Sequence, residues 1–239
     1  MSGHSKWATT HRQKELTDKQ RSKRFSKIIR EIMSAVKTNG SDINTNPKLR
    51  LAIQNAKALN MPKENIERAI HKNIDEIKNY ANITYESVVG VVQIGIVCMT
   101  DNVNRTASDI RALLCRHHGE LCKNGTVMYN FKYNSVFIFK KNVIEDLENF
   151  TLEMIEYDIE DLCENDEETY CLVSTAQNFS KIQNILEKKG IEIQHSLLRY
   201  SPIMTVEIQG EELENIKTLL SSLEDLDDIQ NVFSNLKEL

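Results

Sequence analysis

Hydrophobic residues near the start of the chain recur with a helical period. The period predicts a helix over about Thr17–Thr38 whose apolar stripe consists of Phe25, Ile28, Ile29, Ile32, Met33 and Val36. Lys23, Lys27 and Arg30 fall on the opposite face, where we expect them to project together into solvent. Asn39-Gly40 supplies a left-handed C-cap that ends the helix.

Two shorter helices follow. Asn46-Pro47 predicts a helix start, because Asn caps well and Pro fits the first helical position. The buried stripe of this second helix consists of Leu49, Ala52, Ile53 and Ala56. A third helix begins at Met61-Pro62 and ends near Asn73. We therefore expect a small three-helix domain, whose modest core gains stability by docking on the rest of the chain.

From Tyr85 onward the period becomes that of extended structure. Residues 88–99 are rich in Val and Ile and predict a strand, either bent or paired with itself at Gly90 and Gly95. Asp101-Asn102 marks a turn and the start of a helix. Alternation over residues 127–131 predicts a further half-buried strand.

Residues 136–198 show the element order β-α-β-β-α-β, which is that of a ferredoxin-like unit with a hairpin across the acidic turn 164–168. Residues 203–233 predict a β-α-β segment that matches residues 86–132. The sequence thus predicts an α+β protein with a three-helix domain followed by two ferredoxin-like (split βαβ) domains, one inserted in the other. The predicted boundaries are 1–80 for the basic helical domain, 81–134 with 202–239 for the split α/β domain, and 135–201 for the insert.

The charge is divided unevenly. The net charge of −5 combines residues 1–80, with 17 Lys and Arg against 8 Asp and Glu, and a remainder with 13 against 27. The first part therefore carries +9 and the remainder −14. Such asymmetry indicates a nucleic-acid or other anionic partner for the basic part.

Residues 1–30 hold nine cations against Glu15 and Asp18. The predicted nucleic-acid-binding residues are these cations and the single tryptophan: Lys6, Trp7, Arg12, Lys14, Lys19, Arg21, Lys23, Arg24, Lys27 and Arg30. We expect mainly phosphate contacts that depend strongly on salt. The alternatives are a solvated helix face for the cations and a hydrophobic anchor role for Trp7, in place of stacking on a base.

Other features carry less chemistry. Cys115, His117, His118 and Cys122 lie close in sequence, but their spacing fits no standard zinc site. We expect the acidic run 164–168 to be a solvated turn and Asp101-Asn102 to be a helix cap, while Arg105 is a candidate for a role in a cleft. Nucleophile elbow, phosphate-binding glycine loop and metal triad are absent from the sequence, which predicts no enzyme, no cofactor, no metal and no small-molecule substrate. Without a long apolar run or a signal peptide, the sequence predicts a cytoplasmic protein with reduced cysteines and no membrane contact.

Seven stretches resemble the YebC/PmpR family: Met1–Trp7, Arg24–Glu31, Asn46–Arg50, Asn60–Ile70, Asp101–Thr106, Gly125–Phe131 and Asp227–Phe233. The resemblance covers nearly the whole chain. It implies a helical domain plus two α/β domains around a cleft, and a probable transcriptional regulator that binds DNA. It equally implies the alternative of a translation factor that binds ribosomal or messenger RNA on the ribosome, because a mitochondrial relative activates translation of a respiratory-chain subunit and other members ease elongation through proline-rich stretches.

This chain departs from the family pattern in one loop. Family members carry Tyr-Glu-Gly-Tyr-Gly-Pro-Gly-Gly before the first sheet strand, whereas Tyr85–Val92 keeps Tyr85 and Glu86 but loses most of the glycines and the proline. Any contact that needs close backbone approach at this loop is therefore not expected to carry over.

Overall fold

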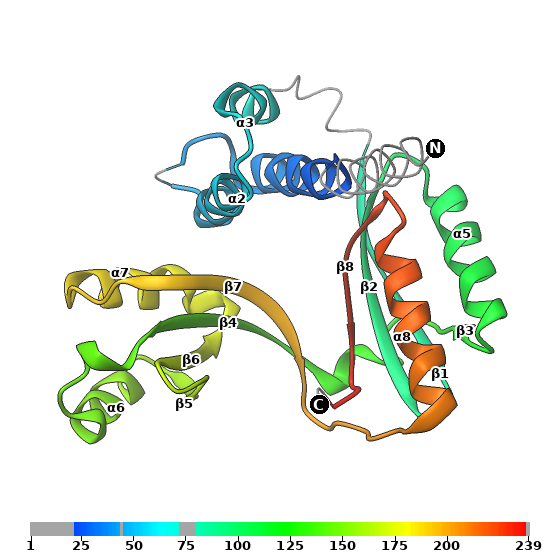
Figure 1. Ribbon diagram of the computed structural model, residues 1–239. Coiled ribbons are helices and arrows are strands. Elements are labelled where there is room, and N and C mark those ends of the chain that lie inside the picture. The colour runs from blue at the N-terminus through cyan, green and yellow to red at the C-terminus, as the bar shows by residue number, and fades with distance from the viewer. Residues whose placement is uncertain (1–21, 44, 72–79, 238–239) are drawn as a thin grey trace, which may run out of the picture. The chain divides into compact units, whose positions relative to one another are not determined.

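The computed structural model describes residues 22–43, 45–71 and 80–237, and Figure 1 shows its elements. The first helix covers residues 22–39; its predicted start near Thr17 lies outside the described residues. It is followed by α2 (Pro47–Ala58) and α3 (Lys63–Ile70). Gly40 ends the first helix with a φ of 83°, and its amide donates to Val36 O. The predicted left-handed C-cap is confirmed.

Asn46 joins the first two helices. Its Oδ1 accepts from the Leu49 amide at 3.1 Å, which caps α2, and Pro47 takes the first helical position as predicted. Its Nδ2 donates to Ala35 O at 2.8 Å and to Gly40 O at 2.7 Å. One fully buried side chain thus satisfies backbone groups at the end of one helix and at the start of the next.

The apolar stripe of the first helix faces two ways. Ile28, Ile32 and Val36 join α2 and α3 in one buried cluster, which confirms the core of the helical domain. Met33 instead packs on Met99, with Ile29 and Tyr80 beside them. Lys37 Nζ donates to Tyr80 O at 2.7 Å, and Asn82 Nδ2 donates to Ser34 Oγ at 3.0 Å. The helix therefore also docks on the sheet that follows it, as the small helical core led us to expect.

The first sheet has four strands in the order β3-β1-β2-β8. Its elements are β1 (Ala81–Val89), β2 (Val92–Thr100), α5 (Val103–Arg116), β3 (Glu120–Leu121), α8 (Gly210–Glu224) and β8 (Ile229–Ser234). The two helices, α5 and α8, contact each other (Figure 1). The predicted strand over 88–99 is two strands, joined by a turn at Gly90-Val91 with Gly90 at a φ of 57°. The second break expected at Gly95 does not occur, because Gly95 lies inside β2.

The second sheet has the order β5-β6-β4-β7, with antiparallel pairing throughout. Its elements are β4 (Phe131–Lys140), α6 (Leu147–Ile155), β5 (Ile159–Glu164), β6 (Thr169–Thr175), α7 (Phe179–Lys188) and β7 (Ile193–Pro202). Phe137 of β4 packs on Phe179 of α7 and Phe139 packs on Phe150 of α6, so both helices cover the same face. Order and direction are those of a ferredoxin-like unit, as predicted for this stretch.

The predicted strand over 203–208 does not form. The Ile203 amide donates to Asn130 O at 2.8 Å, and Met204 exchanges hydrogen bonds with the Asn130 side chain in both directions. These contacts engage the backbone groups that a strand would pair along a sheet. Residues 128–130 form a short 3-10 helix, and the strand expected at 127–131 starts only at Phe131.

The fold class is confirmed: an α+β chain with N-terminal helices followed by two antiparallel four-stranded sheets. The chain divides into two compact units. The first comprises Met1–Gly90, Ile94–Cys122 and Ile208–Val232, and the second comprises Val91–Gln93, Lys123–Glu207 and Phe233–Leu239. The three domain boundaries predicted from sequence stay predictions.

Candidate nucleic-acid interface

The basic face of the first helix meets the C-terminal end of α8. Lys23 Nζ lies 2.8 Å from Asp225 Oδ1 and 3.2 Å from Asp225 O. Lys27 Nζ donates to Glu224 O at 2.7 Å. The last carbonyl groups of a helix lack intrahelical partners and carry partial negative charge, so two ammonium groups stabilise this end of α8.

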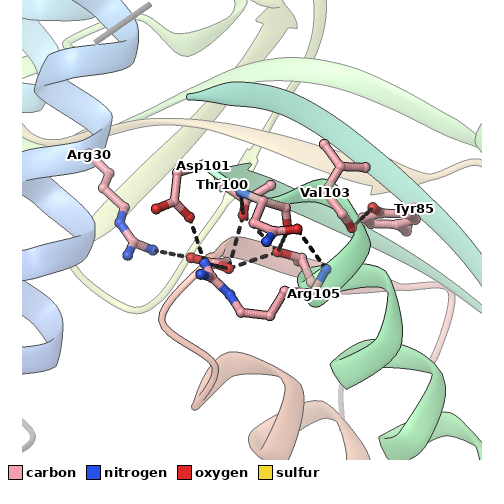
Figure 2. A network of polar contacts seen from close by, with 9 residues as sticks. Arg30, Tyr85, Thr100, Asp101, Val103 and Arg105 are labelled. Carbon is pink, nitrogen blue, oxygen red and sulfur yellow. Dashed lines mark hydrogen bonds and ion pairs between the residues drawn. The ribbon is translucent and has the colours of Figure 1, made fainter. Parts of the chain in front are cut away.

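Arg30 reaches the residue that precedes β8. Its Nη1 lies 3.3 Å from Asp228 Oδ1, and the Arg30 and Asp228 side chains are only 19% and 11% exposed. Figure 2 shows this ion pair beside Arg105, whose Nη2 donates to Asp228 Oδ2 at 2.8 Å and to Asp101 Oδ1 at 2.7 Å. Asp228 thus lies between two guanidinium groups from different elements.

Two hydroxyl groups complete the surroundings of Asp228. Thr100 Oγ1 donates to Asp228 Oδ2 at 3.0 Å and Thr106 Oγ1 donates to it at 2.7 Å. Burial alone would raise the pKa of Asp228, but the hydrogen bonds from Arg105, Thr106 and Thr100 outweigh it and hold that pKa below its ordinary value. Asp228 is therefore a charged carboxylate that ties β2, α5 and the first helix together.

For Lys27, unlike Asp228, burial outweighs the favourable interactions of the charged group. Desolvation by burial lowers its pKa, and the nearby carboxylates of Glu224 and Asp225 only partly counter that effect. Its ammonium group is held by a carbonyl oxygen and by no direct carboxylate contact within the described residues. Replacing Lys27 thus removes a helix-end contact rather than an ion pair.

The expectation that Lys23, Lys27 and Arg30 project into solvent is wrong. The three do share one helix face, but residues 224–228 cover it with two carboxylates and two backbone carbonyls. Opposite charges attract across a contact that is remote in sequence, which helical periodicity cannot detect.

The remaining predicted residues divide into two groups. Lys6, Trp7, Arg12, Lys14, Lys19 and Arg21 lie outside the described residues. Arg24 is exposed and has no ion pair or hydrogen bond with the described part of the chain. Among the described residues of the predicted set, Arg24 is therefore the cation left open to a phosphate.

Two other predictions from the sequence are confirmed by the structure. Asn102 Oδ1 accepts from the Arg105 amide at 3.0 Å, which confirms the predicted cap of α5. The acidic run lies exposed in the β5–β6 hairpin, where Asp166 Oδ1 accepts from the Glu168 and Thr169 amides. Hydrogen bonds from Thr169 and from these amides lower the pKa of Asp166. The run is the predicted solvated turn.

Candidate metal ligands do not gather in the part of the chain that the structure describes. His117 Nδ1 and Asn215 Oδ1 lie 2.7 Å apart, which links the end of α5 to α8. Within the same residues, every helix is too short or too polar to cross a bilayer.

Tyr85, which survives from the altered glycine-rich loop, lies in β1. Its hydroxyl donates to Val103 O at 3.1 Å, and burial raises the pKa of that hydroxyl (Figure 2). The contact ties β1 to the start of α5. A phenol engaged in this way serves packing within the first unit.

Sequence reasoning missed Asp225 and Asp228 as partners of the basic helix. The available signal was the acidic stretch Glu224–Asp228, which falls between a predicted helix and a predicted strand. Thr100 and Thr106 carried no such signal, because isolated threonines are common in strands and helix starts.

Comparison with known proteins covers almost the entire chain. Residues 5–76 match the TACO1/YebC protein N-terminal domain, and residues 80–236 match the TACO1/YebC second and third domain. A probable transcriptional regulatory protein of Amoebophilus asiaticus is 41% identical over 99% of this chain and 98% of its own length. One from Thermotoga maritima is 37% identical over 99% of this chain and 94% of its own length.

A solved structure agrees with these relatives. The crystal structure of a conserved hypothetical protein from Aquifex aeolicus superposes with a TM-score of 0.77 at 36% identity, and the match covers 91% of this chain and 90% of the other. Sequence and structure together lead to one assignment: this chain belongs to the TACO1/YebC family.

Proposed function

We propose that this protein is a non-enzymatic, cytoplasmic regulator of gene expression that binds nucleic acid, with DNA-bound control of transcription as the first candidate. The observation that carries the proposal is the +9 charge of residues 1–80, in a family whose curated relatives are named probable transcriptional regulatory proteins. Cations concentrated at one end of the chain attract the phosphate groups of a nucleic acid, whatever its base sequence.

The proposed contacts are the ten residues predicted from sequence, and they fall into two roles. Lys6, Trp7, Arg12, Lys14, Lys19, Arg21 and Arg24 supply the direct contacts. Lys23, Lys27 and Arg30 would have to leave the acidic turn 224–228 before they could contact phosphate, because that turn already holds their charged groups.

A second candidate function is RNA binding on the ribosome. Two observations favour it. The −14 charge outside residues 1–80 is repelled by a long duplex but is compatible with a protein held by one end in a larger particle. In addition, α3 exposes Lys63, Glu64, Glu67 and Arg68, so its two acids balance its two bases, which is unlike a helix that reads a DNA groove.

The test compares the full-length protein with two charge-reversal variants. Arg24→Glu changes an exposed cation of the basic helix, and Lys188→Glu changes an exposed cation of α7 by the same charge. We expect Arg24→Glu to weaken binding to labelled duplex DNA and to RNA several-fold in fluorescence anisotropy, and Lys188→Glu to leave it unchanged. Equal effects of the two variants would contradict the proposed interface.

Sedimentation of a cell lysate through a sucrose gradient separates the two candidate functions. Migration with ribosomal particles that Arg24→Glu abolishes supports the RNA candidate. Retention on promoter DNA at physiological salt, without a ribosomal peak, supports the DNA candidate. Arg24 is a better probe than Lys23, Lys27 or Arg30, because reversing the charge of any of those three also breaks a contact with residues 224–228.

A further inference from the structure

Two of the five free cysteines face each other across a strand pair in the second unit. Cys163 of β5 is the register partner of Cys171 of β6, and Cys163 Sγ lies 3.8 Å from Cys171 O. Directly opposite residues of antiparallel strands have Cα atoms about 4.5–5.5 Å apart. Disulfides span Cα separations of about 4.4–6.8 Å. None of the other cysteines is paired with another in a described strand register.

The position in the sheet leaves Cys163 open to a reagent, with the buried Cys171 directly opposite it. Leu172 pairs with Phe137, whose ring packs on α7, so the neighbouring Cys171 points to the opposite face of the sheet. Cys171 is 8% exposed there, whereas Cys163 is exposed. β5 is an edge strand, and its pairing shifts register between Ile159 and Asp161. An edge strand with a nearby irregularity can move to bring the two sulfur atoms together.

We propose that Cys163 and Cys171 are a redox modification site that forms an intramolecular disulfide by exchange with a small-molecule disulfide such as oxidised glutathione. The Cys163 thiolate attacks one sulfur of the reagent, forming a mixed disulfide and releasing the first glutathione thiolate. The Cys171 thiolate then attacks the Cys163 sulfur and releases the second. The protein gives up two electrons and two protons, and both protons end on the two glutathione thiols.

The surroundings assign the order of the two steps. Burial, with a smaller contribution from Cys163 and Asp161 on β5, raises the pKa of Cys171 to about 11, although Arg199 on β7 opposes the shift. On β4, Ile138 is the register partner of Cys171, and His195 of β7 faces Ile138 in turn. The exposed Cys163 therefore meets the reagent first, and deprotonation of Cys171 limits ring closure.

The experiment uses the full-length protein and oxidised glutathione, followed by alkylation and digestion. Trypsin releases both cysteines in one peptide, residues 142–181, since Lys141 and Lys181 are the flanking cleavage sites. We expect this peptide to become lighter by about 2 Da and to resist alkylation, because a disulfide has lost two hydrogens. Cleavage after Glu164, Glu167 or Glu168 should leave its two halves joined until a reductant is added.

Two cysteine variants and a pH series test whether Cys171 closes the disulfide with Cys163. Cys171→Ser should stop at a glutathione adduct on Cys163, while Cys115→Ser, which changes an exposed cysteine of α5, should close normally. Ring closure should become about tenfold faster for each pH unit between pH 7 and pH 9, since the thiolate fraction of Cys171 rises in that proportion below its pKa. A glutathione adduct on Cys163 with Cys171 still alkylated after prolonged incubation at pH 9 overturns the proposal. Links that join Cys163 to Cys115 of another molecule overturn it equally.

Discussion

At the scale of single residues, two buried polar side chains hold much of the first unit together. Asn46 serves three backbone partners and Asp228 accepts from Arg105 and two threonines while facing Arg30. Both are almost fully buried. Leaving a buried polar group without a hydrogen-bond partner destabilises a protein by more than one hydrogen bond stabilises it. Substitution of either residue should therefore lower stability.

Replacing Asn46 with Ala should lower the free energy of unfolding of the helical domain by about 2–4 kcal/mol, because the cap of α2 is lost and two buried carbonyl oxygens lose a donor. Chemical denaturation followed by circular dichroism measures the change. Gln54→Ala, at an exposed position of α2, is the control and should change stability little. A similar loss in both variants would show that Asn46 has no special role.

Asp228 should make stability depend on pH. Its pKa is lower in the folded than in the unfolded protein, so its contribution is present above the ordinary Asp pKa of about 4 and is lost as pH falls through the folded-state pKa. Asp228→Asn should cost about 1–3 kcal/mol at pH 7 and flatten the decline in stability as the pH falls below the ordinary Asp pKa of about 4.

Hydrogen exchange of the α5 and α8 amides, followed as a function of pH, measures how the stability of the first unit depends on Asp228. The control is Asp109→Asn, which neutralises an exposed carboxylate of α5. If Asp228→Asn and the wild type lose stability in parallel on acidification, Asp228 is not the group that makes stability depend on pH.

At the scale of elements, the first helix makes contacts on two faces, one buried and apolar and the other basic and partly exposed. Its apolar side packs on α2 and α3, and its basic side caps α8 and reaches Asp228. Periodicity identified both faces from the sequence, yet it assigned the basic one to solvent. The partner lies about two hundred residues away in the chain, and only folding brings it there.

A double-mutant cycle on Lys23 and Asp225 measures this docking. The two side chains are 31% and 69% exposed, so solvent screens their attraction and we expect a coupling energy of about 0.5–1 kcal/mol in stability. The coupling should decrease in 1 M salt, where the Debye length is only about 3 Å. The exposed pair Lys217 and Glu214, which lies within α8, is the comparison and should couple by about 0.3 kcal/mol. No coupling at low salt would mean that the first helix is held by its apolar contacts alone.

At the scale of the whole molecule, charge is segregated along the chain. A protein of net charge −5 is repelled by nucleic acid on average, so any binding has to come from the +9 carried by residues 1–80. The structure reduces the number of these cations that are open to a phosphate, because Lys23, Lys27 and Arg30 are engaged by α8 and the turn that follows it.

Binding to duplex DNA should therefore weaken steeply with salt. Four to six phosphate contacts predict a slope of about −4 to −5 for the logarithm of the association constant against the logarithm of salt concentration. Arg24→Glu should make the slope shallower by about 1, and Lys188→Glu should not. A slope near zero would exclude phosphate contacts as the source of affinity.

Local patterns in the sequence were enough to predict the N-terminal helices, the caps at Gly40, Asn46 and Asn102, and the ferredoxin-like order of the second sheet. These features follow from local periodicity, capping chemistry and turn residues, all of which are written within a few neighbouring positions. Three outcomes depended on the folded chain: Ile203 and Met204 bond Asn130 in place of a strand, a basic helix face meets α8, and Cys163 faces Cys171. Each of those outcomes depends on which distant segment satisfies a backbone group, a charge or a strand edge, and that choice is made only when the whole chain folds.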